Sequence, residues 1–195
     1  HVLRCFEDDN IVHVDGSVDP VRDKETIDLE LQLRDLETLE SFYDKNIRTA
    51  SSGDKTAKKI ITLIKMCMEH LEQGKSIRSM ILNEEELDII HSLYLLTAKP
   101  VLYMCNVDAS SVLEGNKHVN ALCESVKDED SEVIIIATAI ESEIAEFEDA
   151  EERKFFLDEL GLEEPGVHYL IQATYKLLNL QTYFTAGKKE VRAWT

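Results

Sequence analysis

Apolar residues recur at helical spacing through the first half of the chain. From about residue 19 to residue 97 they stand three or four positions apart between charged residues, the pattern of an amphipathic helix. Thr49–Gly53 interrupts this pattern, Gly74 is expected to end a second helix, and Asn83 before three glutamates predicts the start of a third. The segment therefore predicts two long antiparallel helices joined by a tight polar turn, whose ordinary role is packing or partner binding.

Short, continuous apolar runs replace that pattern from Pro100 onward. We predict strands at Val101–Asn106 and Val133–Ala139, and helices at about 116–126, 151–160 and 166–178. Uninterrupted apolar strands between helices indicate a parallel sheet in an α/β domain. His1–Phe6 is expected to add a strand to this sheet, so that the helical pair is an insertion within one domain. Gln181–Thr195 is expected to start a strand pair that the chain is too short to complete.

Composition narrows the class of protein. Hydrophobic residues make up 44% and charged residues 31%, as in ordinary soluble globular proteins. No apolar run approaches the roughly 20 residues of a membrane helix, and no secretory signal opens the chain, so we expect a cytoplasmic protein without a membrane partner. The net charge of −18 repels a phosphate backbone. This charge argues against broad nucleic-acid binding and against sequence-specific DNA binding.

The sequence lacks the motifs of several catalytic classes. No G-x-x-x-x-G-K-[ST] occurs, so the phosphate cradle and its lysine are absent from these residues. The six histidines show no paired metal-ligand spacing, and no G-x-S-x-G elbow is present. The four cysteines are far apart, which favours buried free thiols over disulfides. The chain opens at His1 without an initiator methionine, in what reads as the middle of a strand, so we expect a piece of a longer protein.

Two strand ends carry the candidate chemistry. In open α/β sheets, ligands bind at the carboxyl ends of the strands, and Asn106 directly follows one predicted strand. Its amide suits a purine edge, but an Asx turn at the strand end is the alternative, and spacing alone favours the turn. Ala137, Thr138 and Ala139 end the other strand and are small enough for the backbone to approach a ligand. Simple strand–helix packing is the alternative for these three residues.

Several separated blocks of sequence resemble the YchF, or Obg-like ATPase, family of Obg-related P-loop nucleotidases in the TRAFAC class. They occur in the family's order and are spread over the whole chain. The blocks are Arg4–Val14, Ser52–Lys55, Leu96–Pro100, Leu160–Gly166, Leu178–Gly187 and Glu190–Thr195. Because the first block and the ending are highly specific, the chain is identified as a member of this family.

The resemblance implies an α/β fold. It is the C-terminal half of a Ras-like P-loop nucleotidase domain with a parallel sheet, interrupted by an inserted helical-hairpin (coiled-coil) domain. We expect the nucleotide-binding domain at residues 1–18 and 98–180, the hairpin domain at 19–97 and the start of a TGS domain at 181–195. The P-loop, both switches and most of the TGS domain are expected outside these residues. The 195-residue chain alone is therefore expected to be inactive.

The resemblance also implies a function for the whole protein. Members bind ATP in preference to GTP, use Mg²⁺, hydrolyse ATP slowly and associate with ribosomes. ATP or ADP and the ribosome, through its large subunit, are thus the expected partners of a translation- or stress-related factor, and the Mg²⁺ ligands are expected outside this chain. The alternative is a non-hydrolysing interaction module, in which nucleotide sets the conformation of the helical hairpin.

Residue by residue, the family's base-recognition motif falls on Asn106, Val107, Asp108 and Ala109. Guanine-specific relatives have N-K-x-D at these positions, and the family has N-x-x-E. Ala109 therefore removes the carboxylate, which is worth roughly 1–3 kcal/mol of guanine discrimination. The second base-side segment falls on Ala137–Ala139, where a backbone N–H would serve.

His13 matches a loop histidine that the family resemblance assigns to positioning the attacking water. In related GTPases a switch II glutamine holds this water. The alternative is an ordinary histidine in a surface loop.

Overall fold

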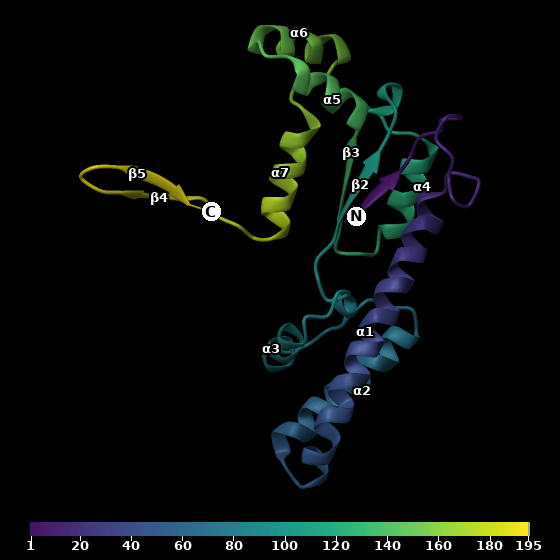
Figure 1. The fold of residues 1–195 in the computed structure, drawn as a ribbon, viewed down its shortest axis with the longest axis vertical. Coiled ribbons are helices and arrows are strands. Elements are labelled where there is room, and N and C mark those ends of the chain that lie inside the picture. The colour runs from purple at the N-terminus through teal and green to yellow at the C-terminus, as the bar shows by residue number, and fades with distance from the viewer. Residues whose placement is uncertain (195) are drawn as a thin grey trace. The chain divides into compact units, whose positions relative to one another are not determined.

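A computed structural model describes residues 1–194, which divide into two compact units (Figure 1). Unit 1 comprises His1–Val21 together with the chain from Val101 onward, and unit 2 comprises Arg22–Pro100. Each unit buries an apolar cluster of its own. Within the described residues, no helix combines the length and the apolar character that crossing a membrane requires.

Unit 1 is built on a three-stranded parallel sheet with the strand order β1–β2–β3. Val2 pairs with Met104, and Cys105 pairs with Ile135, so the predicted parallel α/β sheet is confirmed. The elements of unit 1 are β1 (Val2–Arg4), β2 (Leu102–Asn106), the short 3-10 helix η2 (Ala109–Ser111), α4 (Lys117–Val126), β3 (Glu132–Ile136), α5 (Thr138–Glu146), α6 (Ala150–Leu160), α7 (Gly166–Leu177), β4 (Tyr183–Ala186) and β5 (Val191–Trp194).

The core of unit 1 lies between the strands and the helices that follow them. Tyr103 and Cys105 of β2 and Leu122 of α4 are fully buried, and Ile140 of α5 is buried in the same cluster. Alternate residues of β2 face this core, while α7 contacts β2 and β3. The four cysteines are free, as expected, although Cys123 is exposed.

Two sequence expectations in unit 1 are wrong. The strand expected to reach Ala139 ends at Ile136, and α5 begins at Thr138. Ile140 and Ile144 recur at helical spacing and are both buried, and this burial favours a helix over a longer strand. The strand pair near the end is complete, because β4 and β5 form four antiparallel residue pairs, from Tyr183 with Trp194 to Ala186 with Val191.

Unit 2 is helical. It contains most of α1 (Pro20–Ser51), then α2 (Lys55–Glu72), the 3-10 helix η1 (Ile77–Ser79) and α3 (Glu84–Leu93). Asp54 caps α2 by accepting a hydrogen bond from the Ala57 N–H, and Gly53 turns with a φ of +101° in open space. The predicted start of α3 is confirmed, because Asn83 and Glu86 form a reciprocal capping box.

A buried carboxylate joins α1 to the segment that ends unit 2. Asp35 is 1% exposed, and its Oδ1 accepts from the Leu96 N–H at 2.8 Å. Its Oδ2 accepts from both the N–H and the hydroxyl of Thr97, each at 2.7 Å. The Thr97 hydroxyl oxygen in turn accepts from the Ile77 N–H at 3.3 Å. This network explains why the block Leu96–Pro100 carries a threonine at its second position.

Candidate functional site

The carboxyl ends of the three parallel strands are held together by backbone hydrogen bonds. The Cys5 N–H donates to the Asn106 carbonyl at 2.8 Å, and the Val107 N–H donates to the Ile136 carbonyl at 3.0 Å. The ladder thus continues one residue beyond the ends of β1 and β2. This edge is where ligands bind in open α/β sheets, and it contains the predicted base-side residues.

The side chain of Asn106 is fixed by the first residue of α5. Its Oδ1 accepts from the Thr138 N–H at 3.1 Å and from the Thr138 hydroxyl at 3.0 Å. The structure therefore brings together Asn106 and the second base-side segment, as the sequence predicts for a shared site. With two donors on Oδ1, the side-chain amide nitrogen has its N–H groups directed away from Thr138.

The other residues of the base-recognition motif differ in exposure. Val107 is 3% exposed and belongs to the core, so only its backbone can face a ligand. Ala137 is 1% exposed and is limited in the same way, whereas Thr138 and Ala139 are exposed in the first turn of α5.

Asp108 is engaged within its own loop. Its Oδ1 accepts from the Ser110 hydroxyl at 2.6 Å, and Asp108 precedes η2 as its N-cap residue. Hydrogen bonds from Ser110, and then from Ser111, lower the pKa of this carboxyl group. The neighbouring Ala109 is exposed at the start of η2 and offers no hydrogen-bonding side chain. Of Asp108 and Ala109, only Asp108 carries a carboxylate, and Ser110 donates a hydrogen bond to it.

Asn116 is a positioning residue that the sequence reasoning missed. Its Oδ1 accepts from the N–H groups of His118 and Val119 and so caps α4, while its Nδ2 donates to the Cys5 carbonyl at 2.6 Å. One amide thus connects the start of α4 to the end of β1. An asparagine before a helical pattern signals the cap, but nothing in the sequence identifies the strand end that it joins.

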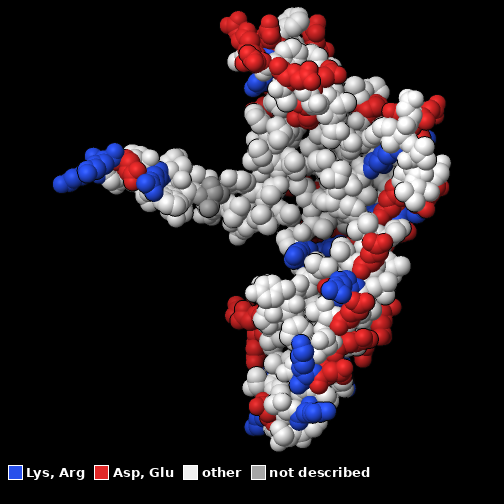
Figure 2. Space-filling view, in the orientation of Figure 1, with Lys and Arg blue, Asp and Glu red and all other residues white. Residues whose placement is uncertain are grey.

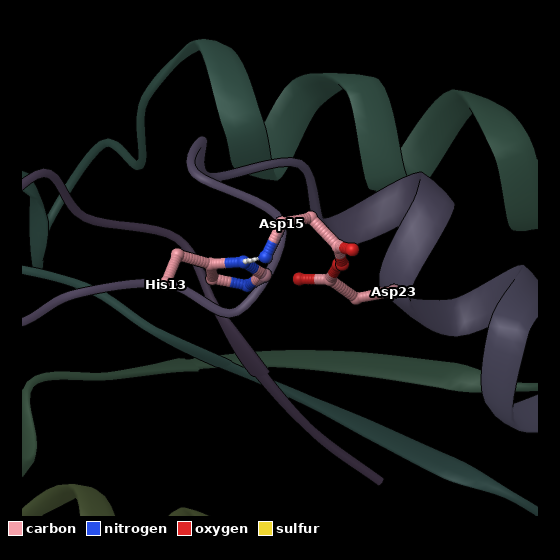
Figure 3. Close-up of side chains that lie close together, drawn as sticks. All are labelled: His13, Asp15 and Asp23. Carbon is pink, nitrogen blue, oxygen red and sulfur yellow. Dashed lines mark hydrogen bonds between the residues drawn. The ribbon is translucent and has the colours of Figure 1, made fainter.

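His13 lies in the loop between β1 and α1. Its Nδ1 accepts from the Asp15 N–H at 3.2 Å (Figure 3). Its carbonyl accepts from the Gly16 N–H at 3.0 Å. Because Nδ1 is an acceptor here, the neutral ring carries its proton on Nε2. The ring is bonded within its own loop, and it is half-buried.

Arg4 organises the beginning of that loop, and the sequence reasoning gave it no role. Its guanidinium donates to the carbonyls of Phe6, Asp8 and Ile11 at 3.0, 3.3 and 2.9 Å. The same group lies over the Phe6 ring, 4.8 Å from its centroid. These contacts give a physical reason for the arginine at the start of the Arg4–Val14 block, because its hydrogen bonds hold the backbone of the loop that leads to His13.

The base-side edge does not suit a magnesium ion. Mg²⁺ prefers carboxylate and water oxygens in octahedral geometry. At this edge Asp108 is bonded to Ser110, and both oxygens of Glu141 cap α7, accepting from the N–H groups of Gly166 at 2.7 Å and Val167 at 3.1 Å. Among the residues that form this edge in the structure, amides and a hydroxyl remain for a ligand.

Comparisons with known proteins agree over the length of the chain. No protein-family model matches it. The ribosome-binding ATPase YchF of Escherichia coli O157:H7 is 47% identical over 195 residues, which cover 100% of this chain and 53% of that protein. The protein of the same name from Bacillus subtilis is 47% identical over 197 residues, covering 100% and 54%.

A solved structure gives the same result for the fold. The YchF GTPase of Schizosaccharomyces pombe superposes with a TM-score of 0.87 at 31% identity, covering 99% of this chain and 53% of that one. The chain thus spans about half the length of the relatives it matches. Over these residues, by sequence and by fold, the chain is similar to about half of a YchF protein.

Proposed function

We propose that the protein containing this chain binds ATP, hydrolyses it slowly with Mg²⁺ and associates with cytoplasmic ribosomes through the large subunit. The observation that carries this proposal is the 47% identity, along the whole chain, to proteins named ribosome-binding ATPase. Residues 181–195, which include β4 and β5, would begin its TGS domain, and residues 19–97 would form its inserted hairpin domain.

The orientation of the Asn106 side-chain amide supports the binding of a purine nucleotide. Its Oδ1 already accepts from two groups of Thr138, so the amide N–H groups are what it can offer to a base. Adenine and guanine both have an acceptor at N7. Asn106 in this orientation therefore selects a purine without distinguishing one purine from the other.

The choice between adenine and guanine then depends on the loop after β2. Guanine presents N–H donors on the edge that the carboxylate of N-K-x-D recognises, and adenine lacks this donor pair. Here Ala109 has no acceptor and the carboxylate of Asp108 is bonded to Ser110. A guanine would lose its partner at this position, at a cost of roughly 1–3 kcal/mol, whereas adenine loses nothing. This argument favours ATP, the nucleotide in the name of the bacterial relatives, over GTP.

Chemistry at the phosphates requires groups that these residues do not supply. The chain contains no P-loop motif, and its base-side edge does not suit Mg²⁺. In the longer protein, the Mg²⁺ ligands and the phosphate-binding loop would come from residues outside this chain. His13 would position the attacking water, with Nε2–H as the donor in the neutral ring.

Titration calorimetry with ADP and GDP tests the proposal, using a protein extended to the length of the relatives. We expect ADP to bind about tenfold more tightly than GDP. Ala109→Asp should shift this ratio toward GDP, whereas Ala150→Asp, the same change at an exposed position on α6, should leave it unchanged. A GDP affinity equal to that of ADP in the unchanged protein would contradict the proposal. The 195-residue chain alone should release no phosphate from either triphosphate.

A further inference from the structure

The turn before α4 places the first residues of that helix beside the end of β1. Gly115 has a φ of +73°, which side chains of L-residues rarely allow, and its N–H donates to the Ser111 carbonyl at 2.8 Å. Asn116 follows as the N-cap residue of α4, with an extended backbone. Figure 1 shows the loop after β1 next to this end of α4. The Gly-Asn pair therefore brings an amide side chain to the edge of the sheet.

The Cys5 peptide group at this edge is hydrogen-bonded from both sides. Its N–H donates to the Asn106 carbonyl at 2.8 Å, and its carbonyl accepts from Nδ2 of Asn116 at 2.6 Å. Nδ2 also lies 3.4 Å from the Ser111 hydroxyl, which is a longer and weaker contact. Because Cys5 is 0% exposed, no water is at hand to replace the amide if it is removed.

A second contact joins the same loop to the first turn of α4. Nε2 of His118 lies 3.1 Å from Oε1 of Glu7, and Nζ of Lys117 lies 3.6 Å from the same oxygen. The Glu7 side chain is 65% exposed, and ion pairs that are open to solvent contribute little. We therefore expect the buried bond from Asn116 to Cys5 to be the stronger of the two attachments.

Arg4 extends this attachment along the loop toward His13. Its guanidinium donates to three loop carbonyls, the last of them that of Ile11 at 2.9 Å. Only Val12 separates Ile11 from His13. The backbone that carries the His13 ring is thus held at Cys5 by α4 and from there onward by Arg4.

We propose that Asn116 positions the loop that carries His13 and thereby supports ATP hydrolysis. The inference rests on the water-positioning role proposed for His13 above, and it adds a residue of another element on which that role depends. Asn116 acts through the Cys5 carbonyl, so it is a positioning residue. Water positioning matters in the transition state and makes no contact with the bound nucleotide in the ground state. Loosening the loop should therefore lower kcat and leave KM for ATP nearly unchanged.

Asn116→Asp isolates the bond to Cys5. Aspartate caps a helix as well as asparagine does, so its Oδ1 can still accept from the N–H groups of His118 and Val119. It has no N–H to donate to the Cys5 carbonyl. In a protein extended to the length of the relatives, kcat for ATP should fall at least about fivefold, with KM unchanged within about twofold.

The matched control is Asn83→Asp, the same chemical change at the N-cap of α3. One more negative charge should matter little in itself, because the net charge is already −18 and acidic side chains are visible over much of the surface in Figure 2. The control should keep kcat within about twofold. Hydrogen exchange of a peptide that spans residues 6–16 should become faster in Asn116→Asp and stay unchanged in the control. An equal fall of kcat in both variants would overturn the proposal.

A double-mutant cycle with His13→Ala separates positioning from a general loss of stability. If Asn116 acts through His13, Asn116→Asp should lower kcat no further in the His13→Ala protein. A similar fall in both backgrounds, or unchanged exchange of residues 6–16, would overturn the proposal. If the extended protein hydrolyses ATP and depends on His13 but not on Asn116, only this proposal fails. If the extended protein without substitutions hydrolyses no ATP, the function proposed above fails, and this proposal fails with it.

Discussion

Replacing Asp35 with alanine should strongly destabilise unit 2. The side chain is buried and accepts three hydrogen bonds, from Leu96 and from both donors of Thr97. Alanine removes the acceptor and leaves these donors in place. Since the Thr97 groups are buried, water cannot replace the lost carboxylate without opening the structure.

The magnitude follows from the cost of unsatisfied donors. Hydrogen bonds to a charged group contribute about 1.5–3 kcal/mol each, and a buried donor left without a partner costs about 1–3 kcal/mol. The three bonds share one carboxylate and are not additive, so we expect Asp35→Ala to lower the free energy of unfolding by about 3–5 kcal/mol. Asp35→Asn keeps one acceptor oxygen but turns an NH₂ group toward the remaining donors, and about 2–3 kcal/mol is expected.

Hydrogen exchange of the α2 amides is the appropriate assay, because a chain with two units need not unfold in one transition. Leu63 and Ile64 are buried in the core of unit 2, so their exchange reports its opening. Asp44→Ala, the same chemical change at an exposed position of α1, is the matched control and should cost less than about 0.5 kcal/mol. A loss below about 1 kcal/mol for Asp35→Ala, or an equal loss for Asp44→Ala, would refute the reasoning.

Three further outcomes are expected. Gly166→Ala should lower stability by about 1–3 kcal/mol in thermal unfolding, because its Cβ would lie 2.9 Å from the Glu141 Oε1 that caps α7; an unchanged melting temperature would contradict this. Ser110→Ala should raise the pKa of Asp108 in an NMR titration, since the Ser110 hydroxyl is the main cause of its lowering. Because the pKa of Asp108 is lowered in the folded state, this group stabilises the fold above the ordinary aspartate pKa, and that stability is lost as the pH falls through the pKa of the folded state. The variant should therefore lose less stability on acidification. An unchanged Asp108 pKa in the variant would refute the role given to Ser110. In the longer protein, His13→Ala should reduce ATP turnover while leaving ATP affinity nearly intact, and unchanged turnover with and without ribosomes would return His13 to an ordinary loop residue.

The local elements of this fold are largely predictable from the sequence, because their causes are local. Asn83 and Glu86 make a capping box from residues three positions apart, and apolar periodicity alone gives α1 and α2. The parallel sheet is predictable for a similar reason, since buried strands between helices have few other arrangements. The start of α5 is not predictable in this way, because Ala137–Ala139 directly follows the apolar run of β3. The burial of Ile140 favours a helix only once its neighbours in the fold are known.

The candidate site was predictable in part. The sequence placed Asn106 and Thr138 at neighbouring strand ends, and the structure adds the hydrogen bonds between them. The contacts of Arg4 with its loop and of Asn116 with Cys5 join residues whose proximity depends on the tertiary fold, so no local pattern reveals them.

The parallel pairing of β1 with β2 has a consequence for the order in which the protein folds. β2 and β3 pair Leu102 with Glu132, but β1 reaches β2 across about a hundred residues, with Val2 beside Met104. Loop-closure entropy grows with the logarithm of the intervening length, so the longer closure costs about 1 kcal/mol more. On the ribosome that makes this chain, β1 emerges first and its partner emerges only after all of unit 2. Unit 2 has its own core and can fold in the interval, shortening the flexible chain that must be closed. Of these three strands, the one that is synthesised first therefore waits longest for the partner that it has here.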